Sequence, residues 1–171
     1  MLAMTDTKGE TLMQVCEIMH EHPVCAFADD NATKVAQLMR EQDTGIIPVI
    51  QAGSGGKLLG VITDRDICLR IIAAGYDPAT VRIRDFMTSD PVCCGPRDPV
   101  GYAMVLMREY RVRRIPVVDR ENRIGGMLTF ANLAGNVASA EELARLLGSV
   151  CTGPTAVAKG DLHVVTAEFS R

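Results

Sequence analysis

The feature that most constrains this chain is a repeat within its own sequence. Shifting the sequence by 68 positions places Leu38–Glu41 on the identical tetrapeptide Leu106–Glu109, and Ile47–Val49 on the identical tripeptide Ile115–Val117. Chance rarely produces two such identities at one offset. The chain is therefore built by internal duplication, and any fold proposed for it must contain two copies of one half.

A second shared motif joins an apolar strand to a polar helix start. After a loop that is two residues shorter in the second copy, Gly60–Thr63 aligns with Gly126–Thr129 at an offset of 66, and each Thr is followed three positions later by Asp66 or Asn132. A Thr at this distance from an acidic side chain is typical of a capping box, in which the two side chains bond each other's backbone N–H groups. The same spacing also suits a ligand contact, and the residues alone leave both interpretations open.

Each copy is predicted to have the element order β-α-β-β-α. Apolar residues at a 3.6-residue spacing predict a helix, and short apolar runs between turn residues predict strands. Pro48 has no N–H for a strand ladder, so we expect its part of the strand at an edge or at a beginning. In the first copy we expect a strand at 24–27, a helix at 31–41, strands at 46–50 and 57–62 around a glycine-rich turn, and a helix from 64 to about 74 that ends at Gly75.

Two short segments precede the two copies. Residues 13–19 and 81–87 carry apolar side chains at helical spacing, and each is expected to form a helical turn that ties one half to the other. A half of about sixty residues buries only about 60% of its unfolded surface, which is marginal for independent folding. We therefore expect the two halves to pack together as one stable unit.

Composition excludes several classes of protein. The net charge of −3 lacks the basic excess of a nucleic-acid binder. The longest uncharged window, residues 124–140, is too short and too polar for a membrane span, and the N-terminus lacks the anatomy of a secretory signal, so we expect a cytoplasmic protein with no membrane contact. The six cysteines show no zinc-site spacing and are expected to be small buried residues, with no metal bound.

The repeated motifs resemble the cystathionine-β-synthase-type (CBS) domain pair. The pattern is Met-x-x-x-Pro-Val, then an apolar residue before Pro-Val, then Gly followed by two apolar residues and Thr-x-x-Asp/Asn, each present twice. The resemblance implies an α/β (α+β) fold in which two β-α-β-β-α repeats are related by a pseudo-two-fold axis. The predicted domains are CBS repeat 1 at 11–75, CBS repeat 2 at 78–138, and a C-terminal helix and tail of unknown role at 139–171.

The resemblance also implies ligand sites in two clefts between the repeats. In that family the clefts bind AMP, ADP, ATP, S-adenosylmethionine and sometimes dinucleotides such as NAD. The third motif holds the ribose, which assigns Thr63 with Asp66 and Thr129 with Asn132 to this role. Apolar residues beside the first two strands enclose the base, and the corresponding residues here are Val24, Cys25, Ile47, Pro48, Ile115 and Pro116.

An arginine cluster distinguishes the second copy from the first. Arg111, Arg113 and Arg114 precede the second apolar-Pro-Val strand, whereas Asp43 stands opposite Arg111 in the first copy. In the family, basic residues at this point often reach ligand phosphates, so the resemblance makes these three arginines phosphate candidates. The alternative is a charge run on a solvated surface.

Two substitutions depart from the family pattern. Phe130 replaces Asp64 of the first copy, and it could crowd the second ribose site or stack on a ligand. Cys25 and Cys93 follow Pro-Val where Thr is frequent in the family. A thiol switch through Cys93 and Cys94, or through Cys25 and Cys93, is a further hypothesis.

The favoured function is a regulatory module that binds an adenosine-containing ligand and transmits the binding to a partner protein that the sequence does not identify. The alternative is a ligand-independent scaffold for dimerisation or protein interaction. No catalytic motif is present, and His20, His22 and His163 lie in a polar junction and in the tail, so we expect neither enzymatic activity nor a catalytic cofactor. The resemblance implies a homodimer that pairs through helices. The tail is expected to contain a helix at 140–147 and a weak strand pattern at 162–169.

Overall fold

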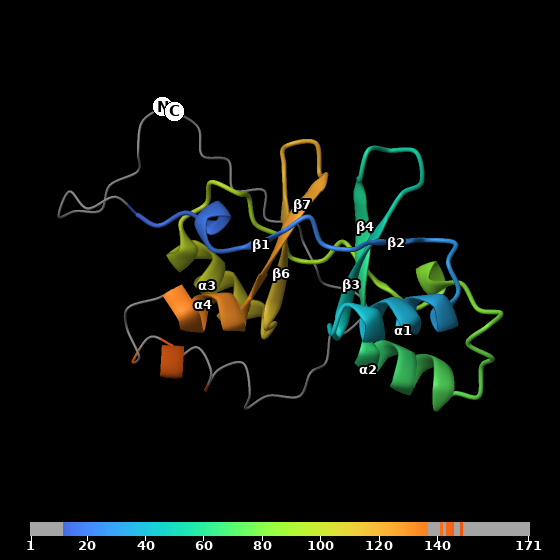
Figure 1. The fold of residues 1–171 in the computed structure, drawn as a ribbon. Coiled ribbons are helices and arrows are strands. Elements are labelled where there is room, and N and C mark those ends of the chain that lie inside the picture. Colours follow the sequence, from blue (N-terminus) through green and yellow to red (C-terminus); the bar gives the residue numbers. More distant parts are fainter. Residues whose placement is uncertain (1–11, 137–140, 142, 146–147, 149–171) are drawn as a thin grey trace.

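The computed structural model describes residues 12–136, 141, 143–145 and 148, and it shows two similar halves side by side (Figure 1). The predicted element order is confirmed in both halves. The first contains β2 (Ala26–Phe27), α1 (Ala32–Glu41), β3 (Ile46–Ile50), β4 (Leu58–Thr63) and α2 (Asp64–Asp66), which continues as the π-helix η2 (Ile67–Ile72). The second contains α3 (Val100–Tyr110), β6 (Arg114–Val118), β7 (Ile124–Thr129) and α4 (Phe130–Asn136), with Cys94 bridged to Val117 in place of β2.

The segments that precede the repeats complete the two sheets. The first sheet has the order β2-β3-β4-β5, in which β5 (Thr88–Ser89) comes from the linker between the repeats. The second has the order β1-β7-β6, in which β1 (His20–Glu21) comes from the N-terminal segment. The second half of the molecule is therefore closed by chain that precedes the first half.

The N-terminal segment and the linker, which are thus exchanged between the halves, also contribute to the two cores. Val15, in the 3₁₀ turn η1 (Val15–Glu17), is 0% exposed within the second core, where its N–H donates to Asp98 O at 2.9 Å. Ile83, in the matching turn η3 (Ile83–Asp85), is 0% exposed within the first core, and its N–H donates to Asp30 O at 3.0 Å. The prediction that these two segments form helical turns that tie the halves together is confirmed.

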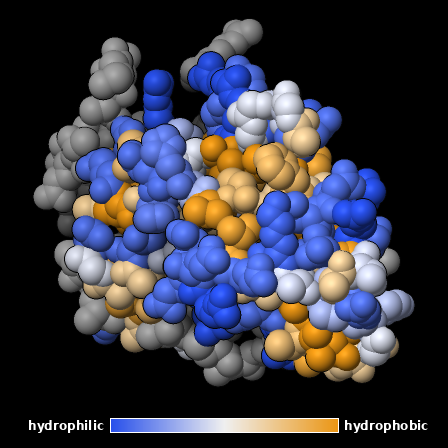
Figure 2. All heavy atoms as spheres, turned by 45° about the vertical axis from the view of Figure 1, so that its right-hand side comes forward, coloured by the Kyte–Doolittle hydropathy of each residue, from blue (hydrophilic) through white to orange (hydrophobic). Residues whose placement is uncertain are grey.

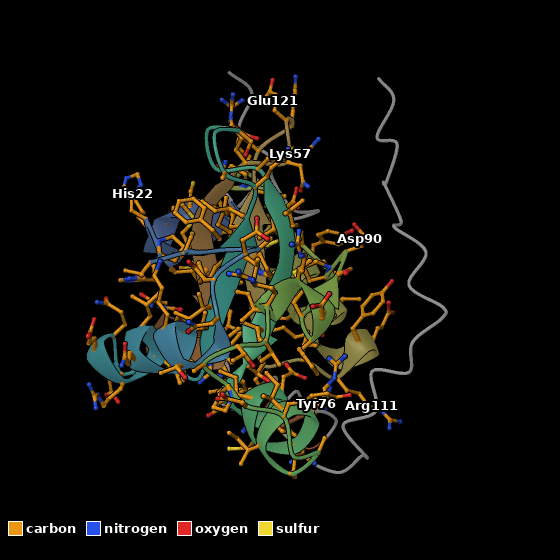
Figure 3. All side chains as sticks on the ribbon, turned by 90° about the vertical axis from the view of Figure 1, so that its right-hand side faces the viewer. His22, Lys57, Tyr76, Asp90, Arg111 and Glu121 are labelled. Atoms are coloured by element: carbon orange, nitrogen blue, oxygen red, sulfur yellow. The ribbon has the colours of Figure 1, made fainter. Side chains whose placement is uncertain are left out.

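The hairpin tips of the two halves are joined directly. Leu58 N–H donates to Asn122 O at 2.9 Å, Asn122 Nδ2 donates to Leu58 O at 3.0 Å, and Ile124 N–H donates to Gly56 O at 3.0 Å. Figure 3 shows Lys57 and Glu121 together at this end of the molecule and Tyr76 and Arg111 at the other end. The bonds at the tips fix the angle between the two hairpins.

Two glycines of the repeated motif lie where the exchanged segments cross. A Cβ added at Gly60 would come within 2.5 Å of Thr88 O, in β5. A Cβ added at Gly126 would come within 2.5 Å of Met19 Sδ and 3.0 Å of His20 O, beside and in β1. Another backbone passes over the strand at both points, so an added side chain is disfavoured there.

Two local predictions need correction. The strand expected at 24–27 is confined to Ala26–Phe27. The helix expected from 64 to about 74 becomes a π-helix after Asp66, with Ala73 N–H bonded to the carbonyl oxygen five residues earlier, on Cys68. The prediction for Pro48 is confirmed, because β2 pairs only with the last two residues of β3 and Pro48 has a ladder partner on β4 alone, so its missing N–H is tolerated.

The predicted tail lies mostly outside the described residues. Residues 141, 143–145 and 148 are helical, and Leu143 packs against the second core. The rest of the helix expected at 140–147 and the pattern at 162–169 fall outside the described part of the chain.

Candidate functional site

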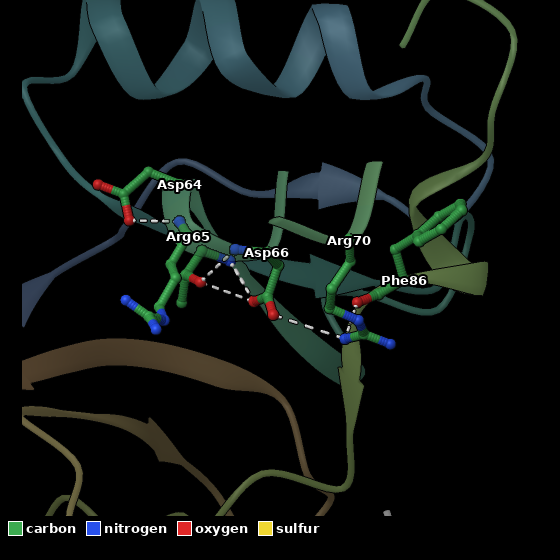
Figure 4. Close-up of polar contacts among 6 residues, drawn as sticks. Asp64, Arg65, Asp66, Arg70 and Phe86 are labelled. Carbon is green, nitrogen blue, oxygen red and sulfur yellow. Dashed lines mark hydrogen bonds and ion pairs between the residues drawn. The ribbon is translucent and has the colours of Figure 1, made fainter. Parts of the chain in front are cut away.

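The first Thr-x-x-Asp motif lies at the junction of β4 and α2 and forms a complete capping box. Thr63 N–H and Thr63 Oγ1 donate to Asp66 Oδ2 at 3.0 and 2.6 Å, and Asp66 N–H donates to Thr63 Oγ1 at 3.1 Å (Figure 4). The Asp66 side chain is 19% exposed. The carboxylate is thus held in one orientation by the backbone, near the surface and not within the core.

The second motif repeats this geometry at the junction of β7 and α4. Thr129 N–H and Thr129 Oγ1 donate to Asn132 Oδ1 at 2.9 and 2.7 Å, and Asn132 N–H donates to Thr129 Oγ1 at 3.3 Å. The interpretation as a helix cap is correct for both copies. Because a cap holds its side chains in place, it is compatible with a ligand contact by the atoms that the cap leaves unused.

Those unused atoms differ between the halves. Asp66 Oδ1 lies outside the capping box and has one contact, with Arg70 Nη1 at 3.5 Å. Asn132 offers its amide nitrogen at the corresponding place. A carboxylate oxygen can accept from hydroxyl groups in charge-assisted bonds, whereas an amide nitrogen donates only, so the first site is the stronger acceptor of a sugar hydroxyl.

Arg70 was not among the sequence candidates, although it follows Asp66 by four residues, a spacing that brings helical side chains together. Its Nη1 also donates to Phe86 O in the linker, as Figure 4 shows. In the second half the matching residue is Asn136, whose Nδ2 donates to Asn132 O at 2.8 Å within its own helix. Among the described residues, side-chain bonds of this kind connect only the first motif to the segment that joins the repeats.

The apolar candidates fall into two groups. Ile47 and Ile115 are 1% and 0% exposed and belong to the two cores, and Pro48 and Pro116 are buried with them. Val24 is 37% exposed and Cys25 is half-buried, so these two residues stand where a base could reach them. Phe27 in β2, which the sequence reasoning did not select, is 44% exposed and offers a further apolar surface.

The three arginine candidates lie around the start of β6. Arg114 pairs with Thr129 in the β6–β7 register, and Arg113 O accepts from Phe130 N–H at 3.0 Å. Arg111 ends α3 in a left-handed conformation, φ 53°, at the end of the molecule away from the hairpin tips (Figure 3). Within the described chain, none of the three forms an ion pair with a carboxylate. The charge of this cluster is therefore uncompensated beside the second motif.

The Thr-x-x-Asp/Asn residues do not line either of two surface hollows in the described structure. One, of about 230 Å³, lies at the hairpin tips and includes Asp119 and Arg123. The other, of about 340 Å³, lies between α1 and η2. Phe130 is half-buried and packs against the second core.

The cysteines after Pro-Val are poor nucleophiles. Burial, with a smaller contribution from Asp90, raises the pKa of Cys93 to about 12, and burial, followed by Asp98 and Cys93, raises that of Cys94 to about 12. Burial also raises the pKa of Cys25. All five cysteines in the described residues are free thiols. The thiolate that disulfide exchange requires is scarce at these three positions near neutral pH, which disfavours the thiol-switch hypothesis.

Two further features concern the described residues, 12–136, 141, 143–145 and 148. No group of three or more His, Cys, Asp and Glu side chains there could hold a metal ion. No helix there has the length and apolar character needed to cross a bilayer.

Comparison with known proteins finds relatives that align over most of this chain. Hypoxic response protein 1 of Mycobacterium tuberculosis is 30% identical over 142 residues, which cover 83% of this chain and 96% of that protein. Its crystal structure, with two coordinated zinc ions, has a TM-score of 0.66 and 30% identity, and the alignment covers 73% of this chain and 99% of that one.

Two ligand complexes share the fold at lower identity. The CBS domain protein PAE2072 of Pyrobaculum aerophilum complexed with AMP has a TM-score of 0.67 at 22% identity, covering 80% of this chain and 99% of that one. The CBS domain pair of protein MJ0100, in complex with methylthioadenosine and S-adenosylmethionine, has a TM-score of 0.64 at 23% identity, covering 72% and 98%.

A family model describes both halves of the chain. The model of the CBS domain matches residues 15–73 and again residues 83–139. These two ranges contain both capping-box motifs and both hairpins. The chain belongs to the CBS domain family and carries two CBS repeats in tandem.

Proposed function

We propose that this protein is a regulatory module that binds an adenosine-containing ligand through the Thr63–Asp66 motif and transmits its occupancy to a partner protein. The observation that carries the proposal is the geometry of Asp66. One carboxylate oxygen is held by the capping box, and the other is left at the surface with a single long contact to Arg70. A fixed carboxylate with an available oxygen suits the adjacent hydroxyl groups of a ribose.

The comparisons support the class of ligand. Two proteins of the same fold were solved with AMP, or with methylthioadenosine and S-adenosylmethionine, and all three ligands contain adenosine. The candidates for this chain are AMP, ADP and ATP, with S-adenosylmethionine and NAD as alternatives. Val24, Cys25 and Phe27 offer the accessible apolar surface for the base.

The arginine cluster supports a preference for a ligand that carries phosphate. Arg113 and Arg114 stand beside Thr129 and lack carboxylate partners in the described structure, so an anionic group bound there would gain charge-assisted bonds. We expect AMP to bind more tightly than adenosine. The double variant Arg113→Gln, Arg114→Gln should reduce this difference while leaving adenosine affinity unchanged.

Isothermal titration of the full chain with the five candidate ligands tests the proposal. Asp66→Ala should weaken binding about tenfold to a hundredfold, because it removes hydrogen bonds to a charged group, and Asn132→Ala should have a smaller effect. Asp85→Ala is the matched control, since Asp85 is exposed in η3 and its carboxylate forms no ion pair in the described structure. No heat with any of the ligands at millimolar concentration would overturn the proposal.

A second candidate function rests on a different observation. Leu69, Ile72 and Tyr76 are 52%, 52% and 53% exposed on the first repeat, an arrangement that favours a protein contact. A ligand-independent interaction scaffold would use this surface and leave the motifs as structural caps. Capture of a partner that is insensitive to every candidate nucleotide would favour the scaffold, whereas nucleotide-dependent capture would favour the regulatory module. No catalytic step is assigned to the chain in either case.

We also propose that the chain forms a homodimer. Closed two-fold dimers are the commonest soluble oligomers. In a dimer, a regulatory module can change the packing between its two copies as well as the arrangement of its two repeats. The measurement is molar mass in solution, set against 18.5 kDa for one chain.

A further inference from the structure

The hollow at the hairpin tips lies at the opposite end of the hairpins from the Thr-x-x-Asp/Asn motifs, and the proposed function does not use it. Its volume is about 230 Å³, and its lining combines both repeats, since Gly55 comes from the first hairpin loop and Arg123 from the second. A Cβ added at Gly55 would lie 3.9 Å from Arg123 Cδ, so the two loops are in close contact at its edge. A molecule bound here would touch both repeats where they are joined.

One glycine distinguishes this place in the second repeat from the matching place in the first. Gly125, in β7, lines the hollow and matches Leu59 at the offset of 66. Leu59 is half-buried in the first repeat, whereas the nearest heavy atom to a Cβ added at Gly125 would be Val117 O at 3.9 Å. The second repeat therefore lacks a branched apolar side chain where the first repeat has one, and it has room for such a group.

The walls of the hollow are apolar and are held in place by backbone bonds. The apolar side chains that line it are those of Met19, Pro96, Val117, Val118 and Ile124. Pro96 O accepts from Cys16 N–H at 2.8 Å, and Gly125 O accepts from His22 N–H at 3.1 Å. Because the exchanged segments fix the chain on both sides, a ligand that enters the hollow has little of the chain to order.

Two unused hydrogen-bond donors lie among the residues that line the hollow. Arg123 Nε donates to Asp119 Oδ2 at 2.8 Å and Arg123 Nη2 to Glu121 Oε2 at 3.1 Å, whereas Nη1 has no partner in the described structure. The N–H of Gly55 likewise donates to no group of the described residues. On the side that Figure 2 presents, hydrophilic atoms lie above hydrophobic ones at the upper end, where Figure 1 places the hairpin loops. A guanidinium N–H and a backbone N–H beside an apolar hollow suit a ligand with an anionic oxygen and an apolar body.

The charges of the hairpin tips favour a single negative charge. Lys57 lies opposite Arg123 in the bridge that joins the tips, and it has no ion pair in the described structure. Two like charges directly opposite each other across a strand pair are unfavourable. With Arg120, the tips carry three cationic side chains against the two carboxylates of Asp119 and Glu121. One anionic group would balance this excess.

The volume of the hollow limits the size of the ligand. A cavity of about 150 Å³ holds benzene, and pockets for drug-sized molecules begin at about 300 Å³. The hollow, at about 230 Å³, lies between these two sizes. It therefore suits a molecule with a single ring and a short chain.

From these observations we propose that the hollow at the hairpin tips is a separate binding site, which takes a small carboxylate with an apolar body of the size of a single ring. The apolar body occupies the space beside Gly125, and the carboxylate accepts from Arg123 Nη1 and from Gly55 N–H. The site shares no residue with the Thr-x-x-Asp/Asn motifs, so it is independent of whether they bind a nucleotide.

Titration of the full chain with hydrocinnamate, followed by two-dimensional amide NMR, tests the site. The shifts should centre on Gly55, Val118 and Gly125. The neutral analogue hydrocinnamamide should bind at least about tenfold more weakly, because it brings no charge to Arg123. The proposal is overturned if millimolar hydrocinnamate moves neither Gly55 nor Gly125, or if the acid and the amide bind equally well.

A variant that fills the hollow gives a second test. Gly125→Leu restores the residue of the first repeat and should weaken hydrocinnamate binding at least about tenfold, because the apolar body loses its buried surface. Gly101→Leu is the matched control, since Gly101 is exposed in α3 and a Cβ there meets open space. Unchanged binding by Gly125→Leu, or an equal loss in Gly101→Leu, contradicts the proposed site.

Substitution of Arg123 decides the question if Gly125→Leu fails to fold. Arg123→Gln removes the cation but keeps the backbone N–H that donates to Asp119 Oδ1 at 2.8 Å, so the turn should persist. Hydrocinnamate should then bind no better than hydrocinnamamide does, and Arg123→Lys, which keeps the charge, should bind it more tightly than Arg123→Gln. Full affinity in Arg123→Gln would rule out the assigned role of the guanidinium and with it the proposal. Titration of the same variants with AMP reports the nucleotide proposal separately, because Thr63 and Asp66 are unchanged.

Discussion

The two halves of this molecule share one sequence pattern but are assembled differently. Apart from a contact at the hairpin tips, the first half takes its sheet and core from one continuous stretch, residues 26–89, because β5 and Ile83 follow it directly. The second half combines residues that follow the first repeat with residues that precede it. The preceding residues are β1 and Val15, which come from the N-terminal segment. Duplication of a sequence therefore does not make two equal folding units, and the second half depends on long-range contacts that the first half does not need.

Substitution of Val15 is the strongest test of this difference between the two halves. Val15→Asp places an unpaired carboxylate at a position that is 0% exposed in the second core, and we expect a loss of more than about 3 kcal/mol in the free energy of unfolding. Hydrogen exchange should rise first in residues 91–136. Met13→Asp, at a side chain that is 40% exposed, is the control. Equal stability of the two variants would contradict the view that the N-terminal segment completes the second half.

Substitution of Gly60 and Gly126, where the exchanged segments cross the strands, compares the two halves through the next largest expected loss of stability. Gly60→Ala directs its new Cβ at a backbone oxygen, Thr88 O, whereas Gly126→Ala meets first a flexible methionine sulfur and has 3.0 Å to the nearest backbone atom. Because a side chain can move and a paired strand cannot, we expect a loss of about 2–3 kcal/mol at Gly60 and about 1 kcal/mol at Gly126. Urea unfolding of both variants measures the difference. A reversed order would show that β5 yields more readily than Met19.

The parts of this fold that could be predicted are those for which the sequence contains a local signal. The elements of each repeat were predictable because strand and helix periods and glycine turns are properties of neighbouring residues. The assignment of Val15 to the second core was not, since Val15 and Ile83 occupy matching positions and are chemically suited to either half. The π-helix at Ile67–Ile72 likewise has no distinct local pattern, because its apolar spacing resembles that of an α-helix.

The candidate site likewise contains features that were predictable from the sequence and features that were not. The bonds between Thr63 and Asp66 were predictable from their spacing, and the structure contains them. The burial of Ile47 and Ile115 was not, since an apolar strand residue can face a core or a cleft with equal propensity. The contact of Arg70 with Phe86 O joins positions 16 residues apart and required the path of the linker.

Replacing the Asn132 amide by a carboxylate tests whether the chemical difference between Asp66 and Asn132 makes the two sites differ in their affinity for AMP. Asn132→Asp gives the second motif a free carboxylate oxygen, and we expect its affinity for AMP to rise about fivefold to tenfold, equivalent to about 1 kcal/mol. The capping box should survive because Asp accepts the same N–H bonds. The measurement is titration in an Asp66→Ala background, where the second site is observed alone. Unchanged affinity would mean that Phe130 or the arginines, and not the acceptor, limit this site.

The smallest expected effect concerns the connection between the first motif and the linker. Arg70→Gln removes a contact to Asp66 at 3.5 Å and the bond to Phe86 O, which the second half does not have because Asn136 stands in place of Arg70. The arginine side chain is 41% exposed, so solvent screening limits the loss of stability to about 0.5–1 kcal/mol. Faster hydrogen exchange should be confined to residues 86–90, and Asn136→Ala should leave the corresponding residues 18–22 unchanged. Because the same guanidinium contacts Asp66 and the linker, binding of AMP at Asp66 should alter exchange at 86–90 in the wild-type chain and not in Arg70→Gln. An equal response in both chains would remove Arg70 from the route between ligand and linker.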